Sequence, residues 1–445
     1  MISASRFTRK AATVAAGSAL LAGALAACGS PTASPTGSGS GAAALPANSA
    51  DANLKGVTLT VWESNSLTAG YKALFTAFEK ATGAKIDQVV FPDPFESNLF
   101  TKWATGARPD LMVFQSAVDD VQQLNPAKNL FDLTGEPYVA KELFHQNEYA
   151  TVLDGRDYGL SLETPSVFGL WFNKQILAAD GISAPTDFDQ LVSACQTIKK
   201  DNPGVSPLYD AGGDQWTTQI LPFMLWTDAM KAGLQNELNA NKTQWTNAAV
   251  VAGLADYQTL IKDGCFNGNL STGTYAQQES DFETGKVAMI PQGSWVSPDL
   301  VQAMGVAKMN EEIGWQALST STPTASYSTT FSLQVPKTGD TANESAALSF
   351  LDFASGPAYQ TFVDTNDQAP AISGFTTPAN VPTALLANYQ ALAGSGYPQL
   401  FAASYGPFTT YMSEMIDGSA TPTKVASDLQ QQWDQSASAL NLPGF

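Results

Sequence analysis

The order of apolar segments at the start of the folded part constrains the fold of this chain more than any other feature. Residues 57–61 and 85–91 have the alternating, β-branched composition of strands, and residues 108–116 hold a third apolar run. Between these runs, residues 69–81 and 95–105 carry large apolar side chains at helical spacing. A strand–helix–strand–helix–strand order predicts a parallel α/β sheet, because sequential parallel strands need a crossover connection.

A second α/β run starts after residue 166, and the end of the chain is mainly helical, with a loop at 364–371. A chain of 445 residues is too long for one hydrophobic core, so two lobes are expected. The predicted elements of the second run are strands at 167–172, 313–318 and 330–335, and helices at 187–200, 217–226 and 248–262.

Small hydrogen-bonding side chains follow two of the strands in the first run. Glu63, Ser64 and Asn65 come at the end of the first strand, and Gln115 and Ser116 at the end of the third. In open parallel sheets, ligands bind beyond the carboxyl ends of the strands. These five residues are therefore candidate ligand-binding residues, and the alternative is that they only form turns and caps.

The charge of the chain restricts the partners it can have. There are 41 Asp and Glu residues against 22 Lys and Arg, which gives a formal net charge of −19. Such a surface repels phosphate backbones, so we expect no nucleic-acid binding. Beyond the first ten residues only Arg108 and Arg156 remain as arginines, which leaves few clamps for anionic ligands. A neutral small ligand is favoured, and a cationic solute such as a polyamine is the alternative.

The N-terminus has the pattern of a targeting segment. Basic residues precede an apolar stretch at 11–24, which ends in Leu25-Ala-Ala-Cys28. This end resembles the lipobox of bacterial lipoproteins, in which the cysteine is acylated after removal of a signal peptide, here residues 1–27. The alternative is an ordinary secretory signal. Residues 28–54 are rich in Ser, Gly, Pro, Thr and Ala, so they predict a flexible tether. We expect a protein held at the outer face of the cell membrane through Cys28 alone.

The remaining cysteines and the only histidine bear on redox state and catalysis. Cys195 lies in a predicted helix and Cys265 at the end of another. An oxidising compartment allows a disulfide between them, and two separate buried thiols are the alternative. His145 is the only histidine, so a multi-histidine metal site cannot form. We expect no metal, no cofactor and no catalytic residue.

Three segments together resemble the family 1 extracellular solute-binding proteins of ABC importers, the sugar-binding group that includes maltose-binding protein. Residues Phe282 to Trp295 read FETGKVAMIPQGSW and match the family pattern F-x-x-G-K-x-A-M-x-x-x-G-x-W at every fixed position. Residues 158–188 follow the pattern Y-G-L-P…Y-Y-N-K…G-I-x-x-P-x-T-W, with departures at Ser161 and Phe188. The third segment is Arg108-Pro-Asp110, ahead of an apolar strand.

The resemblance implies a two-lobed α/β fold like that of periplasmic binding proteins. Each lobe would be a mainly parallel sheet flanked by helices, and hinge crossings would join the lobes. Lobe I would span 55–165 and be completed by 318–355, whereas lobe II would span 166–317 and be completed by 356–445. Closure about the hinge would bury a ligand between the lobes, and an ABC permease would recognise the closed form.

The resemblance also implies residue roles. Trp295 would stand at the rim of the cleft and stack on a sugar ring, because pyranose rings have apolar C–H faces; the alternative is a core position. Trp216, in a Gly-Gly loop, is a second stacking candidate or a helix-start packing residue. Glu163 occupies the place of a ligand-contacting acid, or is a solvated hinge residue. Glu63 and Asp364 are weaker acidic candidates.

Together these features predict a binding protein rather than an enzyme. The expected protein is a lipid-anchored extracellular monomer that captures a mono- or oligosaccharide and delivers it to an ABC import permease. A glycoside-active enzyme would need two paired carboxylates, and no motif places such a pair. A pure adhesion lipoprotein would need no small-ligand cleft.

Overall fold

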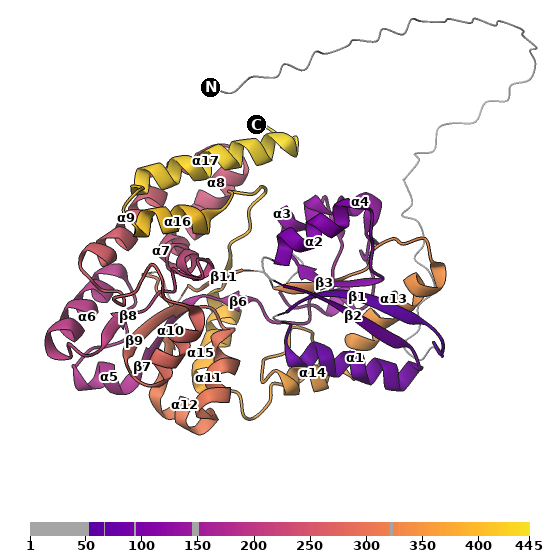
Figure 1. Cartoon of the computed structure of the whole chain (residues 1–445), viewed down its shortest axis with the longest axis horizontal. Coiled ribbons are helices and arrows are strands. Elements are labelled where there is room, and N and C mark those ends of the chain that lie inside the picture. Colours follow the sequence, from indigo (N-terminus) through magenta and orange to yellow (C-terminus); the bar gives the residue numbers. More distant parts are fainter. Residues whose placement is uncertain (1–52, 66, 93–94, 145–150, 321–323, 329) are drawn as a thin grey trace, which may run out of the picture. The chain divides into compact units, whose positions relative to one another are not determined.

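The segments predicted as strands at the start of the folded part form one four-stranded sheet in a computed structural model of the chain (Figure 1). Its strands are β1 (Thr58–Ser64), β2 (Lys85–Phe91), β3 (Leu111–Gln115) and β12 (Phe331–Gln334). The order is β12-β3-β1-β2, in which β1 pairs in parallel with both neighbours and β12 pairs antiparallel with β3. This sheet is mainly parallel, as predicted.

The structure describes residues 53–65, 67–92, 95–144, 151–320, 324–328 and 330–445. The signal peptide, Cys28, most of the tether and His145 lie outside the described residues. In the part of the chain that the structure describes, no helix is both long enough and apolar enough to cross a membrane.

Helices cover both faces of the first sheet. Helix α1 (Ala69–Thr82) buries Tyr71, Leu74, Phe75 and Phe78, whose spacing places them on one side of the helix. We call the sheet and its covering elements lobe I. The other elements of lobe I are α2 (Phe95–Ala104), α3 (Val118–Gln123), α4 (Pro126–Asn129), η1 (Val139–Lys141), β4 (Val152–Leu153), β5 (Arg156–Asp157), α13 (Thr341–Ala354) and α14 (Tyr359–Thr365).

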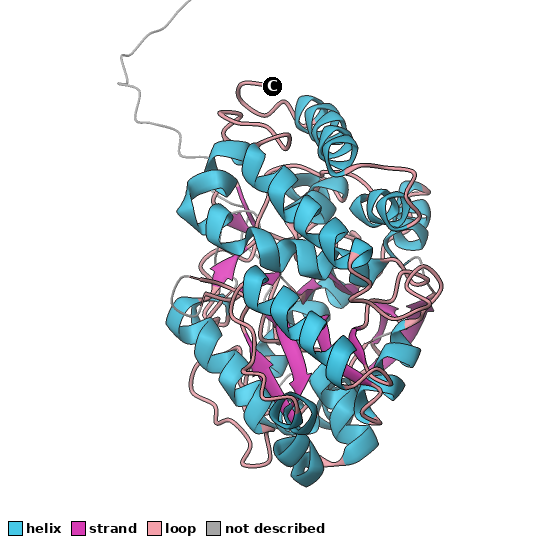
Figure 2. Ribbon diagram, turned by 90° about the vertical axis from the view of Figure 1, so that its left-hand side faces the viewer, coloured by secondary structure: helices cyan, strands magenta, loops and turns pink. Residues whose placement is uncertain are grey.

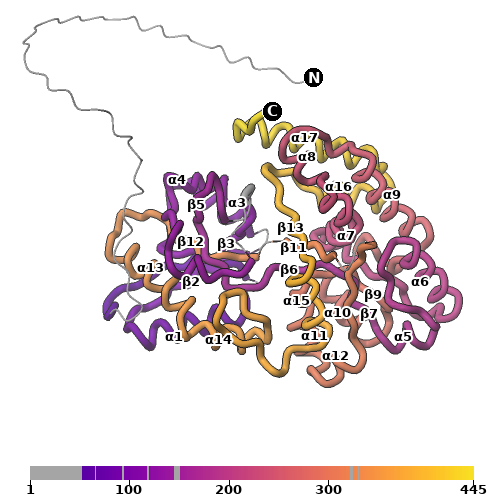
Figure 3. Tube along the Cα trace, turned by 180° about the vertical axis from the view of Figure 1, so that it is seen from behind, coloured from indigo at the N-terminus to yellow at the C-terminus, as the bar shows by residue number. Residues whose placement is uncertain are grey.

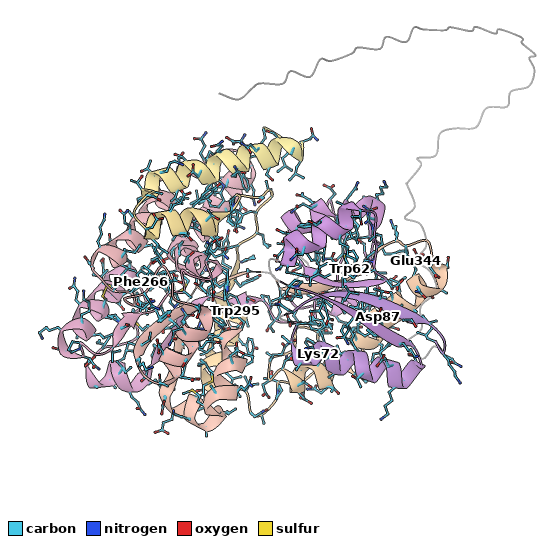
Figure 4. The ribbon with its side chains drawn as sticks, viewed as in Figure 1. Trp62, Lys72, Asp87, Phe266, Trp295 and Glu344 are labelled. Carbon is cyan, nitrogen blue, oxygen red and sulfur yellow. A yellow bond between two sulfur atoms is a disulfide. The ribbon has the colours of Figure 1, made fainter. Side chains whose placement is uncertain are left out.

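Successive side chains of β1 enter two different cores, because neighbouring strand residues point to opposite faces. Leu59 and Val61 share a core with α1, whereas Trp62 packs with α2. The rings of Trp62 and Trp103 lie 6.5 Å apart, edge to face. Trp62, labelled in Figure 4, is therefore a core residue of lobe I.

Helix α14 belongs to lobe I, which differs from the boundary at residue 355 expected from the sequence. Tyr359 and Phe362 share the core of β1 and α1, and the rings of Tyr71 and Phe362 lie 5.0 Å apart. Figure 3 shows α14 (orange) next to α1 (indigo). The apolar face of α14 is buried against α1. Ile372 still belongs to the same core, so the chain returns to the second sheet only after this residue.

The second sheet contains β7 (Gly169–Asn173), β8 (Ser206–Leu208), β9 (Val287–Gln292) and β10 (Ile313–Gln316). Its order is β10-β7-β9-β8. Strands β8 and β9 pair in parallel, whereas β7 pairs antiparallel with both β9 and β10. This sheet is therefore mixed rather than mainly parallel.

Helices surround the second sheet, and with it they form lobe II, which faces the viewer in Figure 2. The C-terminal helices α16 and α17 pack against α9, beside which Figure 3 shows them in yellow. The helices of lobe II are α5 (Lys174–Ala179), α6 (Phe188–Asp201), η2 (Trp216–Gln219), α7 (Ile220–Ala229), η3 (Met230–Leu234), α8 (Gln235–Asn239), α9 (Ala248–Lys262), α10 (Tyr275–Glu283), α11 (Val296–Met304), α12 (Val306–Glu312), α15 (Thr383–Ser395), α16 (Phe408–Ile416) and α17 (Pro422–Ala439).

A small third sheet joins two segments that pass between the lobes to one segment of lobe II. Its strands are β6 (Ser166–Val167), β11 (Ser326–Ser328) and β13 (Tyr397–Pro398), in the order β13-β11-β6. Strand β6 leads from lobe I into β7, and β11 leads from β10 back to β12. Strands β6 and β11 lie near two of the crossings expected from the sequence, and their role as a hinge stays a prediction.

A disulfide joins Cys195 and Cys265. It ties α6 to the segment that follows α9, and both cysteines are fully buried in the core of lobe II. The alternative of two separate thiols is thereby excluded.

Candidate ligand-binding site

The FETGKVAMIPQGSW motif forms strand β9 and the corner that follows it. All six residues of β9 are buried, and Trp295 lies directly before α11 as its N-cap residue. A side chain at Gly293 would place its Cβ 2.1 Å from the Trp295 ring, so only glycine fits beneath this indole. The corner therefore holds Trp295 half-buried at the edge of lobe II instead of inside the strand (Figure 4).

Trp295 forms one wall of a pocket in lobe II with a volume of about 160 Å³. Ligand pockets usually have volumes of about 300–1,000 Å³, so this pocket is one part of a larger site or takes a single small ring. The lining residues come from five separate segments of the chain: Phe168, Trp216, Gln219, Ile220, Phe223, Trp295, Ser328, Gln399, Phe401 and Tyr405.

Trp216, the second stacking candidate, lines the same pocket. It starts η2 and is 36% exposed. Its ring centroid lies 5.8 Å from that of Trp295, and the ring planes form an angle of 63°. On its other side, Trp216 lies 5.0 Å from the ring of Tyr275. The structure thus brings the two predicted aromatic platforms together as an angled corner.

The Gly-Gly loop positions Trp216 by close contact with another segment. A Cβ on Gly212 would lie 2.4 Å from the carbonyl oxygen of Leu270, and one on Gly213 would lie 2.7 Å from that of Thr272. The backbone N–H of Gly212 donates to the Leu270 carbonyl at 2.9 Å. Larger residues would therefore push the loop, and Trp216 with it, away from lobe II.

The chemistry of the pocket is aromatic faces with a few neutral polar groups. Its lining includes the amides of Gln219 and Gln399 and the hydroxyl of Ser328, and no described residue brings a charged side chain into it. Gln399 donates its Nε2 hydrogen to the carbonyl of Phe223 at 2.8 Å. Such a lining suits a neutral ligand that has apolar faces and hydrogen-bonding edges.

The polar candidates after β1 lie in lobe I. Glu63 is only 1% exposed, and its Oε2 has no hydrogen-bond partner among the residues that the structure describes. Burial raises the pKa of the Glu63 carboxyl to about 7, and the Lys72 ammonium offsets part of this rise. Ser64 is buried and donates to Oδ1 of the exposed Asn65 at 3.3 Å.

The candidates after β3 make hydrogen bonds within lobe I. Gln115 donates to Oε1 of Glu96 at 2.9 Å. The hydroxyl of the buried Ser116 donates to the carbonyl oxygen of Thr330. These bonds fit the alternative in which the two residues secure the end of the strand.

Glu163 is half-buried in the segment that leads into β6. Thr68, which precedes α1, donates to its Oε1 at 3.2 Å and accepts a hydrogen bond from Asn366 at 3.1 Å. Burial raises the pKa of Glu163 to about 7, and the hydrogen bond from Thr68 lowers it in part. Asp364 is exposed on α14 and accepts from Gln360 at 2.9 Å. None of the seven polar candidates in lobe I lines the described pocket.

Apart from Trp216 and Trp295, the lining residues were not predicted from the sequence, among them those that follow β13 and the one that precedes β7. Phe401, Tyr405 and Gln399 occupy an irregular segment, and Phe168 lies between β6 and β7. The aromatic content of residues 397–408 was the available signal. Within the described ranges, no group of three or more His, Cys, Asp or Glu side chains is placed to hold a metal ion.

Residues 64–361 match the model of a protein family described as "Bacterial extracellular solute-binding protein", so more than half of the chain is covered. A protein described as "Multiple sugar-binding protein" from Streptococcus mutans is 25% identical to this chain over 212 residues. The alignment covers 46% of this chain and 49% of that protein. The chain thus spans about half the length of this relative.

Several solved structures resemble the chain over most of its length. A chitin oligosaccharide binding protein has a TM-score of 0.74 at 21% identity, covering 86% of this chain and 99% of that chain. RafE in complex with raffinose has a TM-score of 0.71 at 18% identity, covering 85% and 99%. The GacH receptor of Streptomyces glaucescens, studied with acarbose, has a TM-score of 0.68 at 20% identity, covering 85% and 97%. These likenesses confirm the expected α/β fold of the periplasmic-binding-protein type.

Proposed function

The chain belongs to the bacterial extracellular solute-binding protein family, and from this premise we propose that it captures a neutral mono- or oligosaccharide and delivers it to an ABC import permease. As a member of this family it is a binding protein and not an enzyme. The observation that carries the proposal is the corner formed by Trp216 and Trp295 in a pocket whose described lining residues are all uncharged.

Sugar rings suit this corner for physical reasons. The C–H face of a pyranose stacks on an indole, and its hydroxyl groups need hydrogen-bond partners at the ring edge. The amides of Gln219 and Gln399 and the Ser328 hydroxyl offer such partners. The names of similar proteins support the same class of ligand, since they mention multiple sugars, chitin oligosaccharide and raffinose.

The polar candidate residues of lobe I would complete the ligand-binding site when the two lobes close. The described pocket is small for an oligosaccharide, so a second wall is needed. Glu163 is the strongest acidic candidate for this wall, because a carboxylate can accept hydrogen bonds from two sugar hydroxyls, and Glu63 is a weaker one. Asn65, with its exposed amide, could supply a further polar contact.

A calorimetric titration tests the ligand class directly. The full chain is titrated with raffinose, stachyose and chitotriose, and with spermidine as the cationic alternative. We expect at least one sugar to bind with a Kd of about 1 μM, roughly −8 kcal/mol, and spermidine to bind much more weakly. Binding of spermidine without binding of any sugar would contradict the proposal. Small-angle scattering with the bound sugar then reports closure as a fall in the radius of gyration.

The proposed location is the outer face of the cell membrane, with Cys28 as the lipid attachment point. The support is the sequence Leu25-Ala-Ala-Cys28 and the tether that follows it. Such an anchor would hold the binding protein near its permease.

A further inference from the structure

We propose that Gln278 and Gln292 are positioning residues that fix the orientation of the Trp295 ring, an inference that rests on the proposed role of Trp295 as a ligand platform. The indole N–H of Trp295 donates to Oε1 of Gln292 at 3.0 Å. Nε2 of Gln292 donates to Oε1 of Gln278 at 2.6 Å, and Nε2 of Gln278 donates to the backbone carbonyl of Tyr209 at 2.7 Å. Two side-chain amides thus connect the indole to the backbone of another segment.

The two ends of this chain of hydrogen bonds fix its direction. An indole N–H can only donate, and a carbonyl oxygen can only accept. Each amide must therefore present its oxygen toward Trp295 and its NH₂ group toward Tyr209. Gln278 and Gln292 are both fully buried, so water cannot replace a lost partner. A glutamate at either position would lack the hydrogens that its neighbour requires.

The carbonyl at the far end belongs to the segment that also holds Trp216. The next residue, Asp210, is fully buried and accepts hydrogen bonds from the Thr217 hydroxyl at 2.7 Å and the Ala211 backbone N–H at 2.8 Å. Thr217 directly follows Trp216. Trp295 is therefore connected to residues 209–211 through the two glutamines, and Trp216 through Thr217 and Asp210. The angle between the two rings depends on these hydrogen bonds.

This arrangement also limits what Trp295 can offer a ligand. Because Gln292 occupies its N–H, the indole contributes a ring face and no hydrogen-bond donor. Gln292 and Gln278 do not line the pocket, so a change in either one reaches the ligand only through the ring. The two glutamines therefore influence affinity by orienting the platform, without touching the sugar.

The first test observes the indole directly and needs no ligand. In a ¹H–¹⁵N spectrum of the full chain, the Trp295 indole signal is assigned by its loss in Trp295→Phe. We expect Gln292→Leu to shift this signal and to speed its hydrogen exchange. Gln430→Leu is the matched control, because Gln430 is also buried in lobe II and accepts from the Trp245 backbone N–H at 2.6 Å. An indole signal that Gln292→Leu leaves unchanged would overturn the inference.

The second test is a double-mutant cycle titrated with raffinose, stachyose and chitotriose. Gln292→Leu should raise the Kd about three- to tenfold, the range for one hydrogen bond. In a Trp295→Phe background the same change should have almost no effect, because phenylalanine has no N–H to orient. Equal effects in both backgrounds would mean that Gln292 acts on the fold alone, which overturns the positioning role.

The outcomes also separate the two proposals. If Trp295→Ala weakens sugar binding but Gln292→Leu does not, the platform stands and the positioning role falls. If neither change alters the Kd, or if no sugar binds, the proposed function of the corner fails as well. A rise in Kd with Gln430→Leu equal to that with Gln292→Leu would show general loosening of lobe II and overturn the inference.

Discussion

Trp216 and Trp295 meet edge to face with their ring centroids 5.8 Å apart, although one begins η2 and the other precedes α11. Each ring stands at the very start of a helix, and glycine residues provide the space that each one needs. Gly293 leaves room under Trp295, and Gly212 and Gly213 let the loop before Trp216 lie against a neighbouring segment. Leaving two large aromatic side chains half-exposed to water costs free energy unless another group covers them. The corner is therefore a candidate place for a ligand.

Replacing Trp295 with alanine should weaken sugar binding far more than it weakens the fold. A lost aromatic contact and the lost ring area together cost about 2–3 kcal/mol, which is roughly a thirty- to two-hundredfold rise in Kd. Trp103→Ala is the control, because Trp103 is buried in lobe I, outside the pocket. This change should lower the free energy of unfolding by about 3–5 kcal/mol and change the Kd little. Calorimetry and urea unfolding on both variants separate the two roles. A large fall in stability with an unchanged Kd for Trp295→Ala would mean that Trp295 is a core residue.

Replacing Trp216 with alanine should lower the stability less than Trp103→Ala does, because Trp216 is 36% exposed and Trp103 only 6%. We expect the Kd for the bound sugar to rise about tenfold, since one aromatic wall is lost. Trp216→Phe should recover part of the affinity because it retains a ring. An unchanged Kd in Trp216→Ala would remove this residue from the site.

The first sheet could be predicted from the sequence because its signals are local, whereas the two-lobed fold was implied by the family resemblance. The helix 69–81 and the strand 85–91 are visible as periodic apolar patterns, and the structure has α1 and β2 within one residue of them. The return of α14 to lobe I was missed, because a short amphipathic helix does not show which lobe covers its apolar face. The pairing of Cys195 with Cys265 was left open for a similar reason, as it depends on how α6 and α9 pack.

The candidate site was predicted only in part. Trp295 was predicted because it ends a recognisable motif, and Trp216 because it lies in a Gly-Gly loop. Both line the pocket, and their contact with a ligand stays a prediction. Gln292 lies at a variable position of that motif, so nothing in the pattern marks its contact with the indole. Phe401 and Tyr405 enter the pocket from a distant irregular segment, and such contacts depend on tertiary packing that periodicity does not report.

Removing the disulfide should lower the stability of lobe II. Cys195 and Cys265 are separated by 70 positions, and closing a loop of this size stabilises a protein by about 2–4 kcal/mol. The double change Cys195→Ser with Cys265→Ser should therefore unfold at lower urea concentration than the wild type. Dithiothreitol should lower the midpoint of the wild type and leave that of the double variant unchanged. Equal midpoints with and without reductant would contradict a stabilising bond.

Replacing Cys28 with alanine should abolish membrane attachment. If Cys28 is acylated after cleavage, the variant is released from membranes or accumulates with residues 1–27 still present. Fractionation and intact-mass measurement distinguish these products from the wild type. Wild-type protein that is membrane-free and carries an unmodified Cys28 would contradict the anchor.

The stability of the fold should depend on pH through Glu63. Burial holds the pKa of Glu63 at about 7, whereas a glutamate in an unfolded chain titrates near a pKa of about 4.3. Between these values the folded state binds more protons than the unfolded state, so the free energy of unfolding falls as the pH rises through this window. Ionising the buried carboxyl at pH 8 costs on the order of 2–4 kcal/mol.

Glu63→Gln removes that cost while preserving the shape of the side chain. We therefore expect the variant to resemble the wild type at pH 4.5 and to be the more stable protein at pH 8, with urea unfolding as the measurement. Asp364→Asn, at an exposed carboxylate, is the control and should not gain stability across this range. A difference between Glu63→Gln and the wild type that stays constant from pH 4.5 to pH 8 would show that this carboxyl does not titrate as its burial requires.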